Sequence, residues 1–314
     1  MSRPRPKILV VRGGAIGDFV LTLPVFAALR EQFPDTRLEV LGYPHIAQLA
    51  LAGGLVDAVQ PIEARGLASF FVAEGELPPE WVTYFASFAL IISYLYDPDE
   101  IFRANVARCT RAQFIAAPHR PEPGVRRHAT EVYLKPLERL AIFEPDPLPC
   151  LCLKPAPEAP EASDGCWLAA HPGSGSEAKN WPETHWASLL VRLAAHTSWR
   201  LLLVGGEAEG DRLRRLAALW PADRLALAQS LPLADLARRL SRCAWFLGHD
   251  SGITHLAAAL GLPSLVIWGD TDEAVWRPGG TTVRLLRARG GLRALLVEQV
   301  WTALHDLAAA EKNA

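Results

Sequence analysis

A polar, glycine-rich segment in the C-terminal half, Gly248-His-Asp-Ser-Gly-Ile-Thr-His255, has the composition of a phosphate-binding turn. It follows an apolar run that ends at Leu247 and precedes a helical pattern of small residues at 253–260. The first N–H groups of a helix have no partner within the helix, so they can bind an anion. The segment therefore predicts a diphosphate site at the end of a strand.

The same segment has other interpretations. Asp250, Ser251 and His255 suggest a hydrolase, but Ser251 lacks the Gly-x-Ser-x-Gly turn of a nucleophilic serine. His249 and His255 are six residues apart, which does not suit a helical pair of metal ligands. The plainer alternative is that Asp250 or Ser251 caps the helix and that His255 packs in the core.

A second candidate is the loop His171-Pro-Gly-Ser-Gly-Ser176 together with Lys179. Small residues let the backbone approach a phosphate, and one flexible ammonium group can neutralise it. Lysine is scarce in this chain, with five lysines against 27 arginines, so a lysine within a motif is notable. The alternative is a surface loop with a solvated lysine, followed by an ordinary helix start at Trp181-Pro-Glu183.

A third candidate, Gly13-Gly-Ala-Ile-Gly-Asp18, follows the apolar run Lys7–Val11. Its spacing is not Gly-x-Gly-x-x-Gly, and no Gly-Lys-Ser/Thr follows, so it matches neither a dinucleotide fingerprint nor a P-loop. Asp18 has two interpretations. It is either a general base at the carboxyl end of the first strand or a plain N-cap of the next helix.

Apolar runs that alternate with helical patterns position these segments in the N-terminal half. Strands are expected at Lys7–Val11, Arg37–Leu41, Val56–Ile62, Phe88–Leu95 and Gln113–Ala116. Helices are expected at Asp18–Phe33, Pro44–Leu51 and His128–Ile142. Pro24 is expected to kink the first of these helices. Strands alternating with helices predict an α/β fold with a doubly wound parallel sheet.

A stretch with six prolines between Glu144 and Gly165 cannot hold a helix and predicts an extended linker, after which the alternation restarts. Strands are expected at 166–170, 200–204, 225–228, 245–247 and 264–268, with helices at 183–195, 209–219, 233–242, 253–260 and 295–310. We therefore expect two Rossmann-like domains that face a cleft. Their predicted bounds are 1–150 and 151–314.

Composition excludes several classes of protein. The net charge is −2, and neither half is strongly basic, which argues against a nucleic-acid partner. The five cysteines form neither a disulfide framework nor a zinc knuckle, and no apolar stretch reaches the ~18 residues of a membrane span. A cytoplasmic, globular protein is the expectation.

The stretch Arg103–Arg139 is rich in basic residues: it contains eight arginines and lysines but three acidic residues. Such a stretch suits an anionic acceptor or a lipid headgroup, and its plainer interpretation is a solvated face. The lipid interpretation would add peripheral contact with a membrane surface to the cytoplasmic location.

Four sets of motifs occur in order along the chain. They are Ile8-Leu-Val-Val-Arg-Gly-Gly-Ala-Ile-Gly-Asp18, His171-Pro-Gly-Ser174 with Lys179-x-Trp-Pro182, Val204-Gly-Gly206 with Glu209, and Asp250-Ser-Gly-x-x-His255. Together they resemble glycosyltransferase family 9, the lipopolysaccharide heptosyltransferases. The resemblance implies a GT-B fold and inverting transfer of a heptose from an ADP-sugar donor to a lipopolysaccharide inner-core acceptor. It implies no cofactor and no essential metal.

The resemblance also implies roles for individual residues. Asp18 would take the proton of the acceptor hydroxyl, and the loop of Gly13, Gly14, Ala15 and Gly17 would lie on the acceptor side. Lys179 and Ser174 would stabilise the departing diphosphate with the N–H groups of Ser251 and Gly252. The remaining donor contacts would come from Glu209 at the ribose, Leu231 at the adenine, and Asp250 and His255 at the sugar phosphate.

One departure concerns the acceptor. Several heptosyltransferases carry hydroxyl residues in the first loop, whereas Gly14 and Ala15 stand here. Two alternative functions share the fold class: a UDP-sugar 2-epimerase, and a non-catalytic module that binds a nucleotide or sugar. The first would respond to UDP without an acceptor, and the second would not depend on Asp18.

Overall fold

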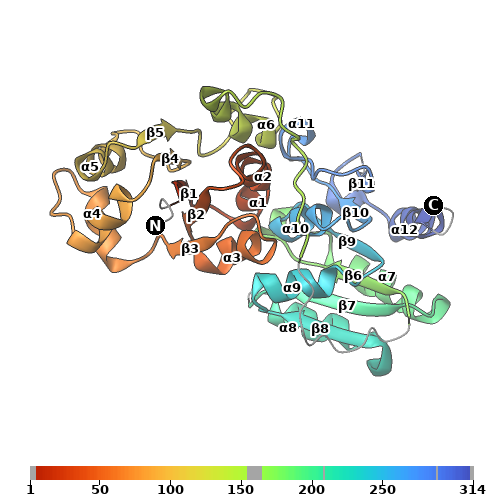
Figure 1. Cartoon of the computed structure of the whole chain (residues 1–314). Coiled ribbons are helices and arrows are strands. Elements are labelled where there is room, and N and C mark those ends of the chain that lie inside the picture. Colours follow the sequence, from red (N-terminus) through yellow and green to blue (C-terminus); the bar gives the residue numbers. More distant parts are fainter. Residues whose placement is uncertain (1–4, 154–164, 208, 288, 312–314) are drawn as a thin grey trace. The chain divides into compact units, whose positions relative to one another are not determined.

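The computed structural model describes residues 5–153, 165–207, 209–287 and 289–311 (Figure 1). The chain divides into two compact units, Met1–Lys154 and Pro155–Ala314, here called the N-terminal and C-terminal units. The expected proline-rich linker falls in part on residues 154–164, which lie outside the described residues. Before that gap, Leu151 is buried within the N-terminal unit, where it packs against Gly53.

The N-terminal unit contains a five-stranded parallel sheet in the order β3-β2-β1-β4-β5. Its strands are β1 Lys7–Arg12, β2 Arg37–Gly42, β3 Ala58–Pro61, β4 Leu90–Ser93 and β5 Gln113–Ala116. Strand β1 is central, with Val10 paired to Val40 on one side and to Ile92 on the other. The strand order reverses at β1, where open α/β sheets place their ligands beyond the carboxyl ends.

Helices of the N-terminal unit depart from the expected pattern in two places. They are α1 Ile16–Val20, α2 Leu23–Gln32, α3 Pro44–Ala52, α4 Pro79–Ala86, α5 Ile101–Cys109 and α6 Ala129–Leu134. The expected helix at 18–33 is two helices, and Pro24 lies in the first turn of the second one, where a proline is tolerated. The expected helix at 128–142 becomes a 3₁₀-helix, η2 Lys135–Leu140, where Pro136 follows α6.

Two helices, α4 and α5, and a 3₁₀-helix of this unit were not predicted from the sequence. The 3₁₀-helix η1 Arg65–Phe71 precedes α4, and α5 follows β4. Phe70, Phe85 and Phe102, one from each of these three elements, are fully buried and pack on one another with ring centroids 4.9–6.4 Å apart. This aromatic cluster covers the sheet beside Leu9 and Ile91.

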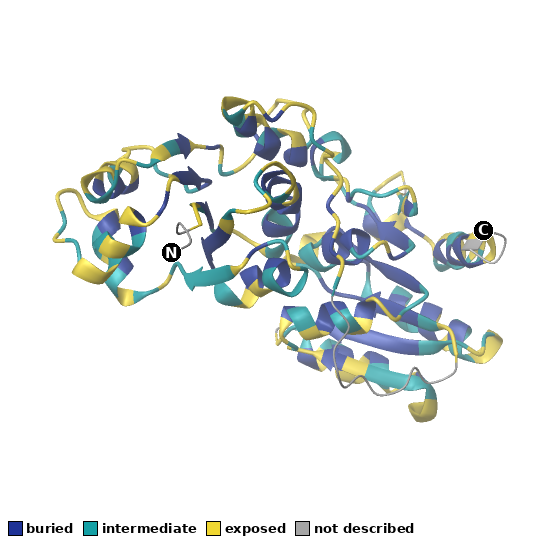
Figure 2. Ribbon diagram, in the orientation of Figure 1, coloured by how far each residue is buried: buried dark blue, intermediate teal, exposed yellow. Residues whose placement is uncertain are grey.

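The C-terminal unit contains a six-stranded parallel sheet in the order β11-β10-β9-β6-β7-β8. Its strands are β6 Trp167–His171, β7 Arg200–Gly205, β8 Leu225–Gln229, β9 Trp245–His249, β10 Ser264–Ile267 and β11 Val283–Leu286. The last of these, an edge strand, was not expected from the sequence. Dark blue runs along the central strands in Figure 2, because both faces of β9 and nearly all of β6 are buried.

Five of the six α-helices described in the C-terminal unit were expected from the sequence, and the short α11 was not. The six helices are α7 Glu183–His196, α8 Gly210–Ala217, α9 Leu233–Leu240, α10 Gly252–Ala259, α11 Glu273–Trp276 and α12 Val297–Glu311. Trp181, Trp186 and Leu247 belong to one buried cluster with α12 residues such as Leu304. Among the described residues, no helix is long and apolar enough to cross a membrane.

Candidate functional site

Asp18 is the third residue of α1, not its N-cap as one interpretation of the sequence held. The N-cap position belongs to Ala15, which has no side chain that could cap the helix. The Asp18 carboxylate instead makes the other half of a capping box, because its Oδ2 accepts the backbone N–H of the N-cap residue Ala15 at 3.3 Å. The side chain is 28% exposed, so the carboxylate remains accessible to solvent.

The glycines before Asp18 keep the backbone close to its carboxylate. Gly14 has a φ of +97°, and a Cβ atom at this residue would lie 3.2 Å from Asp18 Oδ2. A Cβ at Gly13 would lie 3.8–3.9 Å from Leu95 and Tyr43, in ordinary contact. Gly14 is therefore required both by its backbone conformation and by the carboxylate that it faces.

Two residues that sequence reasoning did not select lie against Asp18. Arg12, at the end of β1, is 2% exposed, and its guanidinium donates to the backbone oxygens of Asp18 (3.1 Å) and His119 (2.9 Å). The Tyr133 hydroxyl donates to Asp18 Oδ1 at 3.2 Å. The nearest nitrogen of Arg12 is 3.9 Å from the same Oδ1.

The aromatic groups around Arg12 complete this part of the site. The guanidinium carbon lies 4.5 Å from the ring centroid of Tyr133 and 5.6 Å from that of Tyr94. Burial raises the pKa of Tyr133 to about 12, so its hydroxyl stays protonated. Burial, and then the charges of Arg120 and Arg12, lower the pKa of His119.

In the C-terminal unit, the predicted donor residues follow the carboxyl ends of four neighbouring strands. Ser174 follows β6, Glu209 follows β7, Leu231 follows β8, and Asp250–His255 follow β9. Carboxyl ends of parallel strands meet at one edge of the sheet. The topology therefore places all of them along a single edge.

Lys179 and Asp250 form an ion pair at this edge. Lys179 Nζ lies 2.7 Å from Asp250 Oδ2, and Thr271, which follows β10, donates to the same oxygen at 2.5 Å. The lysine side chain is 45% exposed, whereas the aspartate side chain is 9% exposed. The ammonium group is thus held at the sheet edge but remains accessible to a ligand.

Ser251 is the N-cap of α10, as one interpretation of the sequence predicted. Its hydroxyl accepts the Thr254 N–H at 3.3 Å and lies 3.3 Å from Nδ1 of the buried His171. Burial lowers the pKa of His171 to about 3, so this imidazole is neutral. His255 is buried in the first turns of α10, near Thr254.

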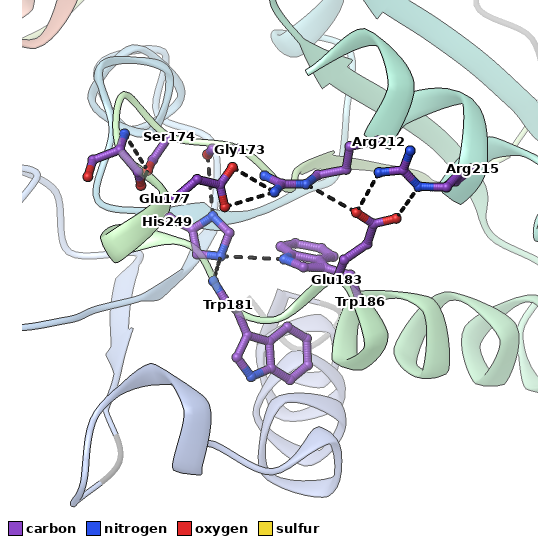
Figure 3. Close-up of polar contacts among 10 residues, drawn as sticks. Gly173, Ser174, Glu177, Trp181, Glu183, Trp186, Arg212, Arg215 and His249 are labelled. Carbon is purple, nitrogen blue, oxygen red and sulfur yellow. Dashed lines mark hydrogen bonds and ion pairs between the residues drawn. The ribbon is translucent and has the colours of Figure 1, made fainter. Parts of the chain in front are cut away.

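His249 anchors the loop that carries Lys179 (Figure 3). Its ring is fully buried; Nε2 accepts the Trp181 backbone N–H at 2.8 Å, and Nδ1 donates to the Gly173 carbonyl at 3.3 Å. The Trp186 indole N–H also points at Nε2, at 3.4 Å. Burial lowers the pKa of His249 to about 4, which fits a neutral ring that accepts at one nitrogen. The sequence did not predict this anchoring role: His249 was considered there only as a metal ligand, for which its spacing from His255 is unsuitable.

Glu209 packs directly over the loop that follows β6. A Cβ at Gly173 would lie 2.6 Å from Glu209 Oε1, so a side chain there would displace the glutamate. Glu209 Oε2 accepts the Gly206 N–H at 2.8 Å. Ser174 is turned toward its own loop, where its hydroxyl donates to the Ser176 carbonyl at 2.7 Å. Leu231 is half-buried beyond the end of β8.

An ion-pair network fixes the far side of this loop to α7 and α8, as Figure 3 shows. Arg212 lies 2.7 Å from Glu177 and 3.6 Å from Glu183, and Arg215 lies 2.6 Å from Glu183. Glu177 thus ties the loop to α8, and Glu183 ties the start of α7 to the same helix. Among the described residues, no cluster of three or more histidines, cysteines and acidic residues could hold a metal ion.

Comparisons with known proteins identify the chain's relatives. The model of "Glycosyltransferase family 9 (heptosyltransferase)" matches residues 152–293. A provisionally named glycosyltransferase of Haemophilus influenzae is 23% identical over 304 residues, which cover 87% of this chain and 86% of that protein. Lipopolysaccharide heptosyltransferase 1 of Escherichia coli O18:K1:H7 is 34% identical over 116 residues, and this match covers 36% of this chain and 34% of that protein.

The solved E. coli heptosyltransferase with ADP has the same fold. It superposes with a TM-score of 0.75 at 19% identity, covering 96% of this chain and 99% of that one. The two parallel-sheet α/β units therefore have the GT-B fold. Within that fold, residues 152–293 match the model of glycosyltransferase family 9, the family that the motifs of the sequence resemble.

The buried neutral histidines predict a pH-dependent stability of the C-terminal unit. Because His249 has a lowered pKa in the folded state, the unfolded chain binds its proton first as the pH falls below about 6.5. Stability is then lost down to the folded pKa, by roughly 1.4 kcal/mol per pH unit for each such histidine. We expect His249→Gln, whose amide can still accept from Trp181, to make this slope shallower by that amount between about pH 6 and pH 5.

Urea unfolding followed by tryptophan fluorescence measures the slope, since nine of the ten tryptophans lie beyond residue 165. The exposed His196→Gln is the matched control. Equal slopes for His249→Gln and the wild type would contradict the prediction.

Proposed function

We propose that the chain transfers a heptose or related sugar from an ADP-sugar to an acceptor of the lipopolysaccharide inner core, with inversion at the anomeric carbon. One observation carries the proposal: a single sheet edge combines the accessible Lys179, the capped start of α10 and the acidic Glu209. These groups suit a diphosphate and a ribose. The E. coli relative solved with ADP and the heptosyltransferase relatives support the choice of donor and acceptor.

The donor's leaving group determines the roles in the C-terminal unit. Lys179, already oriented by Asp250, would neutralise the departing diphosphate together with the N–H groups of Ser251 and Gly252. Ser174 would turn its hydroxyl from the Ser176 carbonyl to the same diphosphate. No metal is required in this proposal, because a cation and a helix start stabilise the developing charge.

The other donor contacts follow the strand ends. Glu209 would accept from the ribose hydroxyls through the lone pairs that Gly206 leaves unused. Leu231 would lie against the adenine, and Asp250 and His255 would shape the pocket of the sugar phosphate.

The acceptor's hydroxyl determines the role of Asp18. In a single displacement, the acceptor oxygen forms the new bond to the anomeric carbon while the carbon–oxygen bond to the diphosphate breaks, and the electron pair leaves with ADP. The proton of the acceptor hydroxyl passes to the Asp18 carboxylate. The proposal assigns the acceptor to the N-terminal unit and the donor to the C-terminal unit.

A panel of nucleotides tests the donor site. We expect ADP to raise the thermal midpoint more than UDP, GDP or CMP at equal concentration, because a ligand at a hundredfold excess over its Kd adds ~2.7 kcal/mol to stability. Lys179→Ala should remove most of this shift, whereas Lys135→Ala, an exposed lysine of η2, should retain it. A preference for UDP would point to the epimerase alternative, and an unchanged response of Lys179→Ala would refute its phosphate role.

Transfer assays with ADP-heptose and an inner-core acceptor test the base. Asp18→Asn should lower kcat by at least ~10²-fold, the lower bound for removing a general base, and should leave ADP binding unchanged. The exposed Asp35→Asn is the matched control. Retention of most of the transfer rate in Asp18→Asn would exclude Asp18 as the base, and retained ADP binding without any transfer by the wild type would favour the non-catalytic module.

An anionic, lipid-linked acceptor suits the basic stretch Arg103–Arg139, whose eight basic residues are all exposed. Arg103 pairs with Glu100, the N-cap of its helix, and Lys135 pairs with Glu138 of η2, while Arg120 and Arg127 lie in the loop before α6. We propose that this stretch gives peripheral contact with an anionic membrane from the cytoplasmic side.

Co-sedimentation with liposomes that contain anionic lipid tests this contact. We expect binding that weakens as salt rises and that falls when Arg120 and Arg127 are both changed to Gln. The matched control changes Arg214 and Arg238, two exposed or half-exposed arginines of the C-terminal unit, to Gln. Binding that is absent at low salt would count against membrane contact.

A further inference from the structure

We propose that Tyr133 is a positioning residue for Asp18: its hydroxyl orients the carboxylate that receives the acceptor's proton. The inference rests on the proposed role of Asp18 as the base. Tyr133 lies on α6, 115 residues from Asp18 in the chain, and its hydroxyl donates to Asp18 Oδ1 at 3.2 Å.

Two donors together fix the plane of the carboxylate. The Ala15 N–H holds Oδ2 at 3.3 Å, and the Tyr133 hydroxyl holds Oδ1. An aspartate with one donor can still rotate about its last bond, because that torsion is broad. With a donor at each oxygen, the carboxylate has one preferred orientation, and each oxygen keeps lone-pair capacity for a proton.

The Tyr133 hydroxyl is itself held in place. Its ring lies over the Arg12 guanidinium, with 4.5 Å between the centroid and the guanidinium carbon. The Tyr94 hydroxyl donates to the Tyr133 backbone carbonyl at 2.6 Å, and the two rings meet edge to face with centroids 5.9 Å apart. Both tyrosine rings are almost completely buried. The hydroxyl that reaches Asp18 therefore has little freedom to move.

The other charged and titratable groups around Asp18 have different hydrogen-bond partners, and Tyr133 donates to its carboxylate. Arg12 is committed to the carbonyls of Asp18 and His119, and its nearest nitrogen is 3.9 Å from Oδ1, beyond a hydrogen bond. His119, on the loop after β5, contributes its backbone oxygen to Arg12, and Tyr94 contacts Arg12 and Tyr133. Tyr133 is the side chain that donates to the carboxylate in this group of residues.

Removal of the hydroxyl has two expected effects. Tyr133→Phe keeps the ring over Arg12 but removes the donor to Oδ1, so the carboxylate loses its fixed orientation and kcat should fall by roughly tenfold, the scale of one hydrogen bond to a charged group. A carboxylate that has lost a donor also binds its proton at higher pH. The acidic limb of the pH–kcat profile should move upward, while the acceptor KM changes little.

A titration that does not require substrate tests the inference directly. In protein with ¹³C-labelled aspartate, the Asp18 carboxyl signal is assigned by its absence from Asp18→Asn, and its midpoint is compared between the wild type and Tyr133→Phe. We expect a higher midpoint in Tyr133→Phe and no change in Tyr84→Phe. The latter removes a hydroxyl from α4, where the ring packs against Trp81, Phe85 and Phe88.

The titration and the assays separate the two proposals. An unchanged Asp18 midpoint in Tyr133→Phe overturns the positioning role, whatever the enzyme transfers. A raised midpoint supports the contact, and a tenfold loss of kcat with an upward-moved acidic limb supports its role in transfer. If Asp18→Asn keeps its transfer rate, the base assignment fails, and the positioning role in catalysis fails with it.

Discussion

The N-terminal unit depends on one buried cation, the guanidinium of Arg12. A charge that is 2% exposed must find partners within the protein, since desolvation costs several kcal/mol per ion. Arg12 finds them in the backbone oxygens of Asp18, in α1, and of His119, in the loop after β5, and in the face of the Tyr133 ring. The ends of β1 and β5 and the helix α6 are therefore tied to a single point beneath the exposed carboxylate.

In the C-terminal unit, the buried side chain that holds the loops at the end of the sheet is neutral. His249 also ends a central strand and also joins two loop segments, through the Trp181 N–H and the Gly173 carbonyl. A neutral imidazole suits this position because it offers one hydrogen-bond donor and one acceptor, which match the Gly173 carbonyl and the Trp181 N–H. Burial keeps the ring uncharged. In both units, a buried polar side chain at the end of the central part of the sheet fixes the loops whose tips carry the candidate site.

The sequence predicts the location of the site better than its internal contacts. Motif residues follow strands, and parallel strands bring their carboxyl ends together, so the edge that carries Ser174, Glu209 and Asp250 follows from the alternation alone. Contacts between distant segments do not: Tyr133 and Asp18 are 115 residues apart, and no local pattern marks a tyrosine on a short helix as a partner. The interpretation of Asp18 as an N-cap was wrong. The N-cap is Ala15, which has no capping side chain, and Asp18 lies three residues further along the chain. Pro24 and Pro136 each changed a helix that periodicity alone would have continued.

The ion pair between Lys179 and Asp250 has a consequence for how an anion enters. Because the ammonium group is already neutralised, an incoming ligand competes with a protein carboxylate instead of meeting an unpaired charge. If the lysine turned toward a ligand, the hydrogen bond from Thr271 would still give Asp250 a partner. The pair would therefore select against weakly charged ligands: a group with two negative charges would attract the ammonium more strongly than the single carboxylate does, whereas a singly charged ion would not.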